Sequence, residues 1–319
     1  MMRYNIKLPP IRDDMSGYFY LSRLSDAVIS NPDSSYVFYF ENCSTISHNG
    51  LAVIGGLCNY ITQHHENKNP VESALNKMLG VRKVGFNIDN ISQKVMEKIT
   101  DCGFWNYIKP EYGISFNSKR IGYREHETVL EDSQIINHLR DNWITNDKIA
   151  MSDALKEEVV SSIYEIFVNA YGHGLKDNPL GKRVISCGNY DQKSKELSLS
   201  VLDFGGGIVN SVQGNQNIHD KKIAFEWALK NGNSTRTDSP PDLPRGLGFG
   251  ILKEFVKVNQ GNLIVVSDEY LATVGKNGEY STVALPGHFH GTMVNITVKC
   301  DNRYYKLRKE PIEESNTYF

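Results

Sequence analysis

Three glycine-rich turns in the second half of the chain restrict its fold more than any other feature. The first, Asp203-Phe-Gly-Gly-Gly-Ile208, follows the alternating apolar run 197–202, which is the pattern of a strand entering a tight turn. The second, Arg245-Gly-Leu-Gly-Phe-Gly250, precedes a helical pattern that begins near Ile251. The third, Gly291-Thr292, opens an alternating strand. Glycine is used where the backbone must approach a ligand or take positive φ, so these turns between strands and helices indicate a ligand site.

A polar face runs along the stretch 161–173, ahead of these turns. Glu165 and Asn169 are four residues apart and His173 is four further on, so on a helix the three lie on one face. A carboxylate can accept a proton from water, and an amide oxygen can ligate Mg²⁺. The pattern fits either a metal-nucleotide site or an amphipathic helix with a polar outer face. The opposite face is expected to pack on a core and carries Val160, Ile163, Phe167 and Ala170.

Taken in order, the motifs ExxxN, DxGxGI, RGxGxG before a helix and GT before a strand resemble the GHKL superfamily of ATP-binding domains. That group includes gyrase-type ATPases, histidine-kinase ATP domains and anti-sigma-factor serine kinases. The resemblance covers about residues 150–300 and implies a two-layer α/β sandwich. It also implies that Glu165 is the general base, that Asn169 ligates Mg²⁺ and that Asp203 accepts a hydrogen bond from the adenine amino group.

The same resemblance assigns the glycine-rich turns to the nucleotide. Gly205 and Gly207 would let the backbone pass close to the base, with Ile208 beside them, and Thr292 would support the adenine pocket. The second turn would wrap the phosphates, and its expected contacts are Arg245, Gly246, Leu247, Gly248 and Gly250. The polar segment 231–244, which is rich in helix breakers, would form a lid over the nucleotide; a surface loop without ligand contact is the alternative.

Physical chemistry agrees with these assignments. Amides at a helix N-terminus bind phosphate through unpaired N–H groups and the helix dipole, and Gly248 and Gly250 stand just before a predicted helix. A buried Asp203 that accepts from an amino group would reject guanine, whose carbonyl leaves the carboxylate unpaired. Such an unpaired buried group costs about 1–3 kcal/mol, and more when it is charged.

The first 130 residues alternate between strand and helix patterns. Strands are expected near 36–40 and 84–88, and helices near 13–31, 50–61 and 90–102. This alternation implies a parallel sheet covered by helices. The runs 38–53 and 99–104 resemble a STAS domain, the fold of anti-sigma-factor antagonists. His48 stands where the signalling members carry a phosphorylated serine, so a serine switch is not expected there, and we interpret His48 as an ordinary turn or helix-start residue.

The predicted domain organisation has four parts. A STAS-like α/β domain covers 1–130, a linker helix covers 131–150, the GHKL ATP-binding domain covers 151–300, and a solvated C-terminal tail covers 301–319. Within the third part His288 and His290 lie two residues apart. Two histidines without a third ligand nearby are expected to be a structural pair, because protein metal sites need three or more ligands as a rule.

Composition limits the compartment and the partners. The 319 residues carry a formal net charge of −2, which argues against a general nucleic-acid binder, and no apolar run is long enough to span a membrane. The N-terminus lacks the apolar core of a signal peptide. The 5 cysteines are scattered and form no CxxC pair, so neither a zinc ribbon nor a disulfide framework is indicated, and the expected location is cytoplasmic.

Three functions stay open at this level. The first is a Mg²⁺-dependent ATPase switch, in which Glu165 activates water and lid closure controls a partner protein. The second is a protein kinase of the anti-sigma serine/threonine type, with Glu165 deprotonating a partner's hydroxyl. The third is an ATP-binding interaction module that does not hydrolyse. ATP and Mg²⁺ are the expected ligands, the protein partner is unidentified, and a homodimer formed on closure also stays open.

Overall fold

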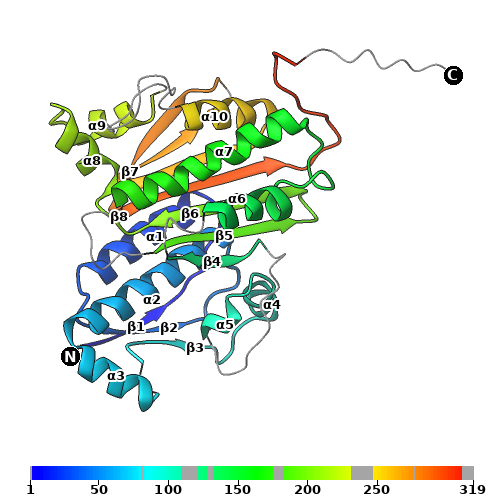
Figure 1. The fold of residues 1–319 in the computed structure, drawn as a ribbon. Helices are drawn as coiled ribbons and strands as arrows, with labels where there is room; N and C mark the ends of the chain where they lie inside the picture. The colour runs from blue at the N-terminus through cyan, green and yellow to red at the C-terminus, as the bar shows by residue number, and fades with distance from the viewer. Residues whose placement is uncertain are drawn as a thin grey trace.

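The computed structural model describes residues 2–80, 82–108, 121–127, 132–174, 183–230, 247–275 and 277–310. They form a three-stranded parallel sheet and a five-stranded antiparallel sheet, so the predicted α/β fold is confirmed. The elements stack in four layers (Figure 1). The parallel sheet is followed by α1 (Met15–Ile29) and α2 (His48–Lys68), then by the antiparallel sheet, then by α7 (Asp153–Asn169) and α10 (Leu247–Asn259).

The N-terminal sheet has the order β1-β2-β3, and its strands are β1 (Arg3–Lys7), β2 (Ser35–Tyr39) and β3 (Val84–Asn87). Parallel neighbours need crossover connections, which α1 supplies between β1 and β2, and α2 with α3 (Pro70–Met78) between β2 and β3. The predicted strands and helices of this part are confirmed, the last helix as α4 (Gln93–Asp101), which α5 (Trp105–Ile108) follows. Strand β1 was not predicted, because it is mostly polar and exposed.

The second sheet has the order β4-β5-β6-β8-β7, and all its neighbours are antiparallel. Its strands are β4 (Tyr123–His126), β5 (Val184–Asp191), β6 (Glu196–Asp203), β7 (Asn262–Val274) and β8 (Tyr280–Lys299). The boundary that we expected at residue 130 would put β4 in the N-terminal domain. Its hydrogen-bonded register with β5, from Tyr123 opposite Cys187 to His126 opposite Val184, places it in the second sheet.

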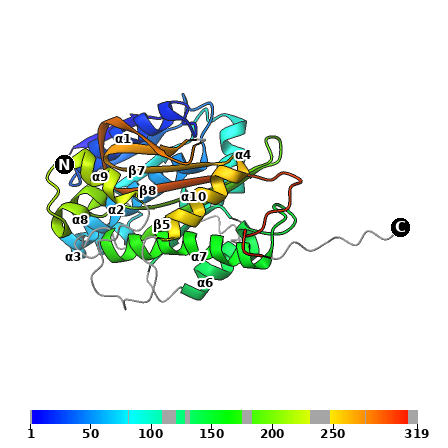
Figure 2. The same cartoon turned by 90° about the horizontal axis from the view of Figure 1, so that it is seen from above.

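Helices α7 and α10 cover one face of the second sheet (Figure 2). The Ser152 side chain caps α7 by accepting a hydrogen bond from the Leu155 amide at 3.2 Å. The expected apolar face of this helix is buried, as Val160, Ile163, Phe167 and Ala170 are all at most 6% exposed. In place of a single linker helix, the chain ahead of α7 forms α6 (Asp132–His138) and a π-helical turn, η3 (Leu139–Trp143), whose Trp143 is fully buried.

Helices α1 and α2 cover the other face of the same sheet. Because side chains alternate along a strand, one set of apolar residues points to α7 and α10 and the next set points to α1 and α2. The second set joins the core of the N-terminal part and includes Ile185, Cys187, Leu202, Ile264, Val266 and Met293. The two sheets therefore share a hydrophobic core, and helices enclose the antiparallel sheet on both faces.

Two adjacent glycines allow α2 to approach the second sheet closely. A Cβ atom built on Gly55 would lie 2.3 Å from the Tyr123 ring of β4, and one built on Gly56 would lie 2.6 Å from the Phe204 ring. Phe204 directly follows Asp203 at the end of β6, and its ring also meets Tyr60 of α2 and Phe289 of β8, with ring centroids 6.3 and 6.1 Å away. The N-terminal half thus lies directly behind the first glycine-rich turn.

Replacing Gly55 by alanine is expected to lower the free energy of unfolding by about 1–3 kcal/mol. The added methyl group must displace the Tyr123 ring, and overpacking of a close-packed core has that cost. Urea unfolding measures the change. Gly214, inside the helix α8 (Gly207–Asn215), has no atom within 4 Å of an added Cβ and provides the control. Gly214→Ala should leave stability unchanged or raise it by up to about 1 kcal/mol, and an equal effect of the two substitutions would contradict the close contact.

Strands β7 and β8 form a long hairpin that reaches beyond the rest of the sheet. The register shifts between Ser267 and Asp268 and again between Asp268 and Tyr270, and the far part of the hairpin pairs Tyr270 with Ala284. This part of the hairpin lies against α1. The contact is close at Gly287, where an added Cβ atom would lie 2.9 Å from the Arg23 Cα. The hairpin also contacts α9 (Lys221–Ala228). There the Tyr270 ring of β7 stacks on the Phe225 ring of α9, with ring centroids 5.5 Å apart.

The segment that follows β8 returns to the start of α7. Tyr305 is 5% exposed, and its backbone amide donates to the Ala150 carbonyl at 3.0 Å. The Ser152 hydroxyl donates to the Glu310 carboxylate at 2.7 Å. The expectation of a solvated tail is therefore wrong as far as residue 310, because Tyr305 packs on the core beneath α10. Among the described residues, no helix combines the length and the apolar character needed to cross a membrane.

Candidate functional site

Asp203 lies at the end of β6 and is 3% exposed. Its Oδ1 accepts a hydrogen bond from the Gly205 amide at 2.8 Å, which folds the glycine-rich turn back onto the carboxylate. Within the described residues no lysine, arginine or histidine forms a salt bridge with it. Burial raises the pKa of Asp203 to about 7, and the nearby carboxylate of Asp268 contributes in the same direction. Among the described residues, backbone amides are the donors to this buried carboxylate, which holds no charged partner there.

Gly291 and Thr292 face Asp203 across the sheet, as the register pairs Asp203 with Thr292. Gly291 has φ of +89°, and a Cβ built on it would lie 2.1 Å from the Asp203 carbonyl oxygen and 2.7 Å from the Phe204 Cα. No side chain fits in that space, and the left-handed conformation itself favours glycine. The structure thus brings together Asp203 and Thr292, which the sequence placed in one adenine pocket.

The turn after Asp203 leads directly into α8, whose first residue is Gly207. Gly207 has φ of +77°, and a Cβ built on it would lie 2.9 Å from both carboxylate oxygens of Asp268. We expected glycine here because the backbone approaches the base; the structure shows that an approaching protein carboxylate also requires it. Gly205 and Ile208 are half-buried on either side.

Helix α7 carries Glu165 and Asn169, both half-buried, on the face away from its core residues. Its end continues into a π-helical turn, η4 (Ala170–Gly174), which contacts β6, β8 and α8. The carboxylate and the amide of the predicted metal-nucleotide pair therefore lie toward the end of the sheet that carries Asp203 and Thr292. The side chain of His173 lies outside the described residues.

The start of α10 differs from the prediction by one turn. The helix begins at Leu247, not near Ile251, so Gly248 and Gly250 lie within its first turn. In the following turns the apolar side chains of Leu252, Phe255 and Val256 pack against α7 and the sheet. This packing stabilises the helix, so that it includes the glycines at its start. Arg245, Gly246 and the expected lid 231–244 lie outside the described residues.

Ser267 and Asp268 of β7 are site residues that the sequence analysis missed. Both are buried, at 0% and 3% exposure, and both contact the backbone of the α8 N-terminus. Asp268 has φ of +55°, which is uncommon for any residue with a Cβ. The one signal in the sequence is a Ser-Asp pair inside an apolar strand run, a place where Asp is depleted.

Three of the four histidines considered in the sequence have described side chains, and each of these contacts neighbouring side chains. His48 begins α2, as expected, and is 3% exposed; its Nε2 lies 2.7 Å from the Asn295 Oδ1 of β8, and burial lowers its pKa. His288 and His290 contact each other, with ring centroids 4.4 Å apart. Within the described part of the chain no three or more of the residues His, Cys, Asp and Glu are grouped to hold a metal ion.

Comparison with known proteins adds little to this geometry. No protein-family model matches the sequence, and no curated protein is similar to it. Among solved structures, the chain is similar to a histidine kinase domain from Erythrobacter litoralis EL346 blue-light activated histidine kinase. The two are 14% identical with a TM-score of 0.28, over 78% of this chain and 94% of that one. A similarity at this level does not assign the chain to a family.

Proposed function

We propose that this chain is an ATP-binding protein of the GHKL type and that it works as a Mg²⁺-dependent ATPase switch. The observation that carries the proposal is the buried carboxylate of Asp203, folded against the Gly205 amide at the end of a central strand. The adenine amino group would supply the hydrogen-bond donor that this carboxylate lacks among the described side chains. Guanine presents a carbonyl at the same position and would leave the carboxylate unpaired, at a cost of about 1–3 kcal/mol or more.

The residues present fit a nucleotide with its metal ion. Gly205 and Gly207 supply a backbone without side chains beside Asp203, and Thr292 lies across from it. The phosphates would lie against the first turn of α10, where the amides of Leu247, Gly248 and Phe249 precede the first intrahelical hydrogen bond, with Arg245 and Gly246 just ahead in the sequence. The Asn169 amide oxygen would hold Mg²⁺, which neutralises phosphate charge when bound.

Glu165 is the proposed general base. It lies one turn before Asn169 on the polar face of α7, so its carboxylate can accept a proton from a water molecule directed at the terminal phosphate. The segment 231–244 would close over the nucleotide and exclude bulk water from the site.

The N-terminal part is the proposed recipient of the nucleotide signal. Its sequence runs 38–53 and 99–104 resemble a STAS domain, and its α2 lies against Phe204, the residue after Asp203. A shift of the turn on nucleotide binding would press directly on the Gly55–Gly56 surface of α2. The state of the site would thus reach the parallel sheet and a protein partner, in a cytoplasmic compartment where the five free, buried cysteines stay reduced.

The experiment that tests the proposal combines binding with turnover. Calorimetric titration with ATP and with GTP, beside phosphate release with Mg-ATP, should show ATP binding, GTP binding that is at least about fivefold weaker, and turnover that is lost when EDTA removes the metal. ATP binding without turnover would favour a non-hydrolysing module or a kinase that awaits its substrate, and transfer of labelled phosphate to a protein in cell extract would identify the kinase. Absence of ATP binding would overturn the proposal.

Replacing Glu165 by glutamine is expected to lower turnover by about 10²–10⁴-fold, the usual contribution of a general base. The amide keeps the shape of the side chain but accepts no proton, so the Kd for ATP should stay within about threefold. Phosphate release and titration on the same preparations separate the two effects. Glu157, on the same helix and 53% exposed in its side chain, is the control, and Glu157→Gln should leave turnover unchanged. Equal turnover in Glu165→Gln and the wild type would remove the assigned base.

A further inference from the structure

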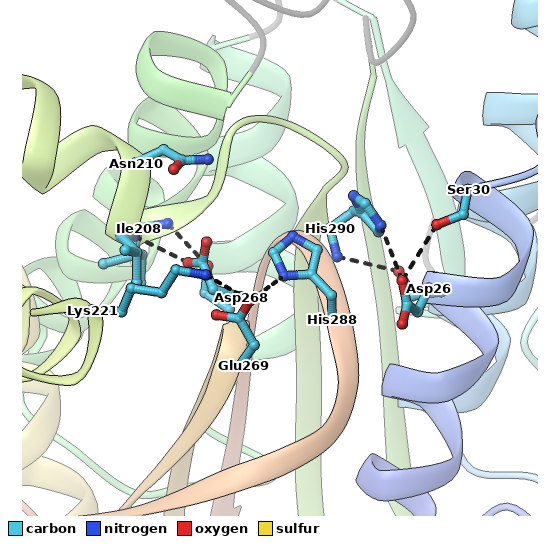
Figure 3. A network of polar contacts seen from close by, with 12 residues as sticks. Asp26, Ser30, Ile208, Asn210, Lys221, Asp268, Glu269, His288 and His290 are labelled. Carbon is cyan, nitrogen blue, oxygen red and sulfur yellow. Dashed lines mark hydrogen bonds and ion pairs between the residues drawn. The ribbon is translucent and has the colours of Figure 1, made fainter.

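Ser267 and Asp268 sit at an irregularity in β7, where the pairing with β8 shifts register. The register change and the left-handed conformation of Asp268 turn both side chains toward the start of α8. Figure 3 shows Asp268 beside Ile208, with Glu269 and His288 on its other side. The bulge thus directs polar side chains of an otherwise apolar strand to the turn that follows Asp203.

Both side chains accept hydrogen bonds from the first amides of α8. The Ile208 amide donates to the Ser267 Oγ at 2.9 Å, and the Val209 amide donates to the Asp268 Oδ2 at 3.0 Å. The residue that would normally cap this helix is Gly206, which has no side chain to do so. The cap of α8 therefore comes from β7, whose capping side chains lie 59 residues away along the chain.

Ser267 also holds the opposite wall of the candidate adenine pocket. Its hydroxyl donates to the Gly291 carbonyl at 2.6 Å and lies 3.3 Å from the Thr292 Oγ1. The pair thus joins the turn after Asp203 to the Gly291-Thr292 segment, and the required glycine at position 207 is part of the same contact. Because the Asp268 carboxylate already occupies the positive end of α8, we expect the phosphates at α10 and not here.

We infer that Ser267 and Asp268 are positioning residues for nucleotide binding, which hold the 203–209 turn and the Gly291-Thr292 segment at the spacing that adenine requires. This inference rests on the proposed function. Neither residue is expected to touch the nucleotide. Asp268 is itself flanked by Glu269, which lies 3.0 Å from the Lys221 Nζ and 3.2 Å from the His288 Nδ1.

The test compares two substitutions at position 268 that both tolerate its left-handed backbone. Asp268→Gly removes the cap, whereas Asp268→Asn keeps an acceptor oxygen and suits positive φ. Gln260, with φ of +58° in the turn between α10 and the start of β7, gives the matched control Gln260→Gly. Two quantities are measured on each folded protein, namely amide hydrogen exchange of residues 205–212 without nucleotide and the Kd for ATP.

We expect Asp268→Gly to speed exchange of this segment and to raise the Kd at least tenfold. Asp268→Asn should restore both to within about threefold of the wild type, and Gln260→Gly should change neither. Ser267→Ala, which removes the acceptor of the Ile208 amide, should act in the same direction as Asp268→Gly and serves if that variant does not fold. Faster exchange with an unchanged Kd, or unchanged exchange, would overturn the inference. A wild type with protected amides that binds no ATP would instead overturn the proposed function.

Discussion

Replacement of Asp203 by asparagine is expected to weaken ATP binding by about ten- to hundredfold and to stabilise the ligand-free protein at alkaline pH. The lost interaction is a hydrogen bond to a charged acceptor, worth roughly 1.5–3 kcal/mol, which corresponds to that range of Kd. Titration of ATP at pH 8 measures it. Asp220→Asn, at the exposed N-cap of α9, keeps a capping side chain and should change neither binding nor stability.

The stability effect follows from the pKa of Asp203, which is raised from 3.8 to about 7 in the folded protein. Between these two values the folded state holds a proton that the unfolded state releases. The stabilisation is therefore fully present below about pH 4 and is lost as the pH rises through 7. At pH 8 the ionised, buried carboxylate costs up to about 4 kcal/mol, and Asp203→Asn removes that cost. A pH series of urea unfolding should show a smaller decline in the variant, and parallel curves would contradict the raised pKa.

ATP binding by the wild type should have the opposite pH dependence to its stability. The protonated carboxyl of Asp203 cannot accept from the adenine amino group as the carboxylate does. Binding should therefore weaken as the pH falls below 7, by about tenfold per unit once the group is mainly protonated. The two opposite trends, one in stability and one in affinity, are expected from a single residue and should both vanish in Asp203→Asn.

Gly291→Ala is expected to lower the free energy of unfolding by about 3 kcal/mol or more and to abolish ATP binding. The added Cβ would overlap the carbonyl of Asp203 and the Cα of Phe204, which are backbone atoms that no rotamer change can move aside. The positive φ adds a further cost of about 1 kcal/mol for a residue with a Cβ. Thermal and urea unfolding measure the loss, together with ATP titration on whatever folds.

Substitution of Gly80 separates the two costs expected at Gly291, namely the steric overlap of the added Cβ and the positive φ. Gly80 has φ of +68°, but no atom lies within 4 Å of an added Cβ. Gly80→Ala should therefore cost only the backbone term of about 1 kcal/mol. Similar losses in the two variants would show that the Asp203 strand is not packed against Gly291 as closely as the structure has it.

The elements that the sequence predicted well are those whose signal is local. The periodicity around Glu165 gave a helix with its apolar face correctly placed, because helix amphipathicity is readable within a few turns. Asp203 and Thr292 were predicted to share a pocket, and the antiparallel register pairs them. The roles of Glu165, Asn169 and the glycines of the second turn remain predictions.

The features that the sequence did not reveal depend on contacts between distant segments. The apolar residues of α1 and α2 predicted helices that pack on the parallel sheet of the N-terminal half. They did not predict that the same helices also cover the antiparallel sheet. The cap of α8 by Ser267 and Asp268 joins segments that no local pattern connects, and Asp268 in a strand is unfavourable by propensity alone. The helix α10 extends one turn earlier than its glycines suggested, because tertiary packing overrides glycine's low helix propensity.

The shared core has a consequence for how this chain folds during synthesis. His48 and its partner Asn295 are 247 residues apart, and Asp13 and Asn295 are 282 apart. The ribosome therefore completes α1 and α2 long before β8 emerges. Until then, the apolar side chains that these helices bury against the antiparallel sheet stay exposed in the nascent chain. Chains that depend on such distant pairings fold slowly and are prone to aggregate while they wait. The N-terminal half is thus expected to need chaperone protection until nearly the last residue of β8 has left the ribosome.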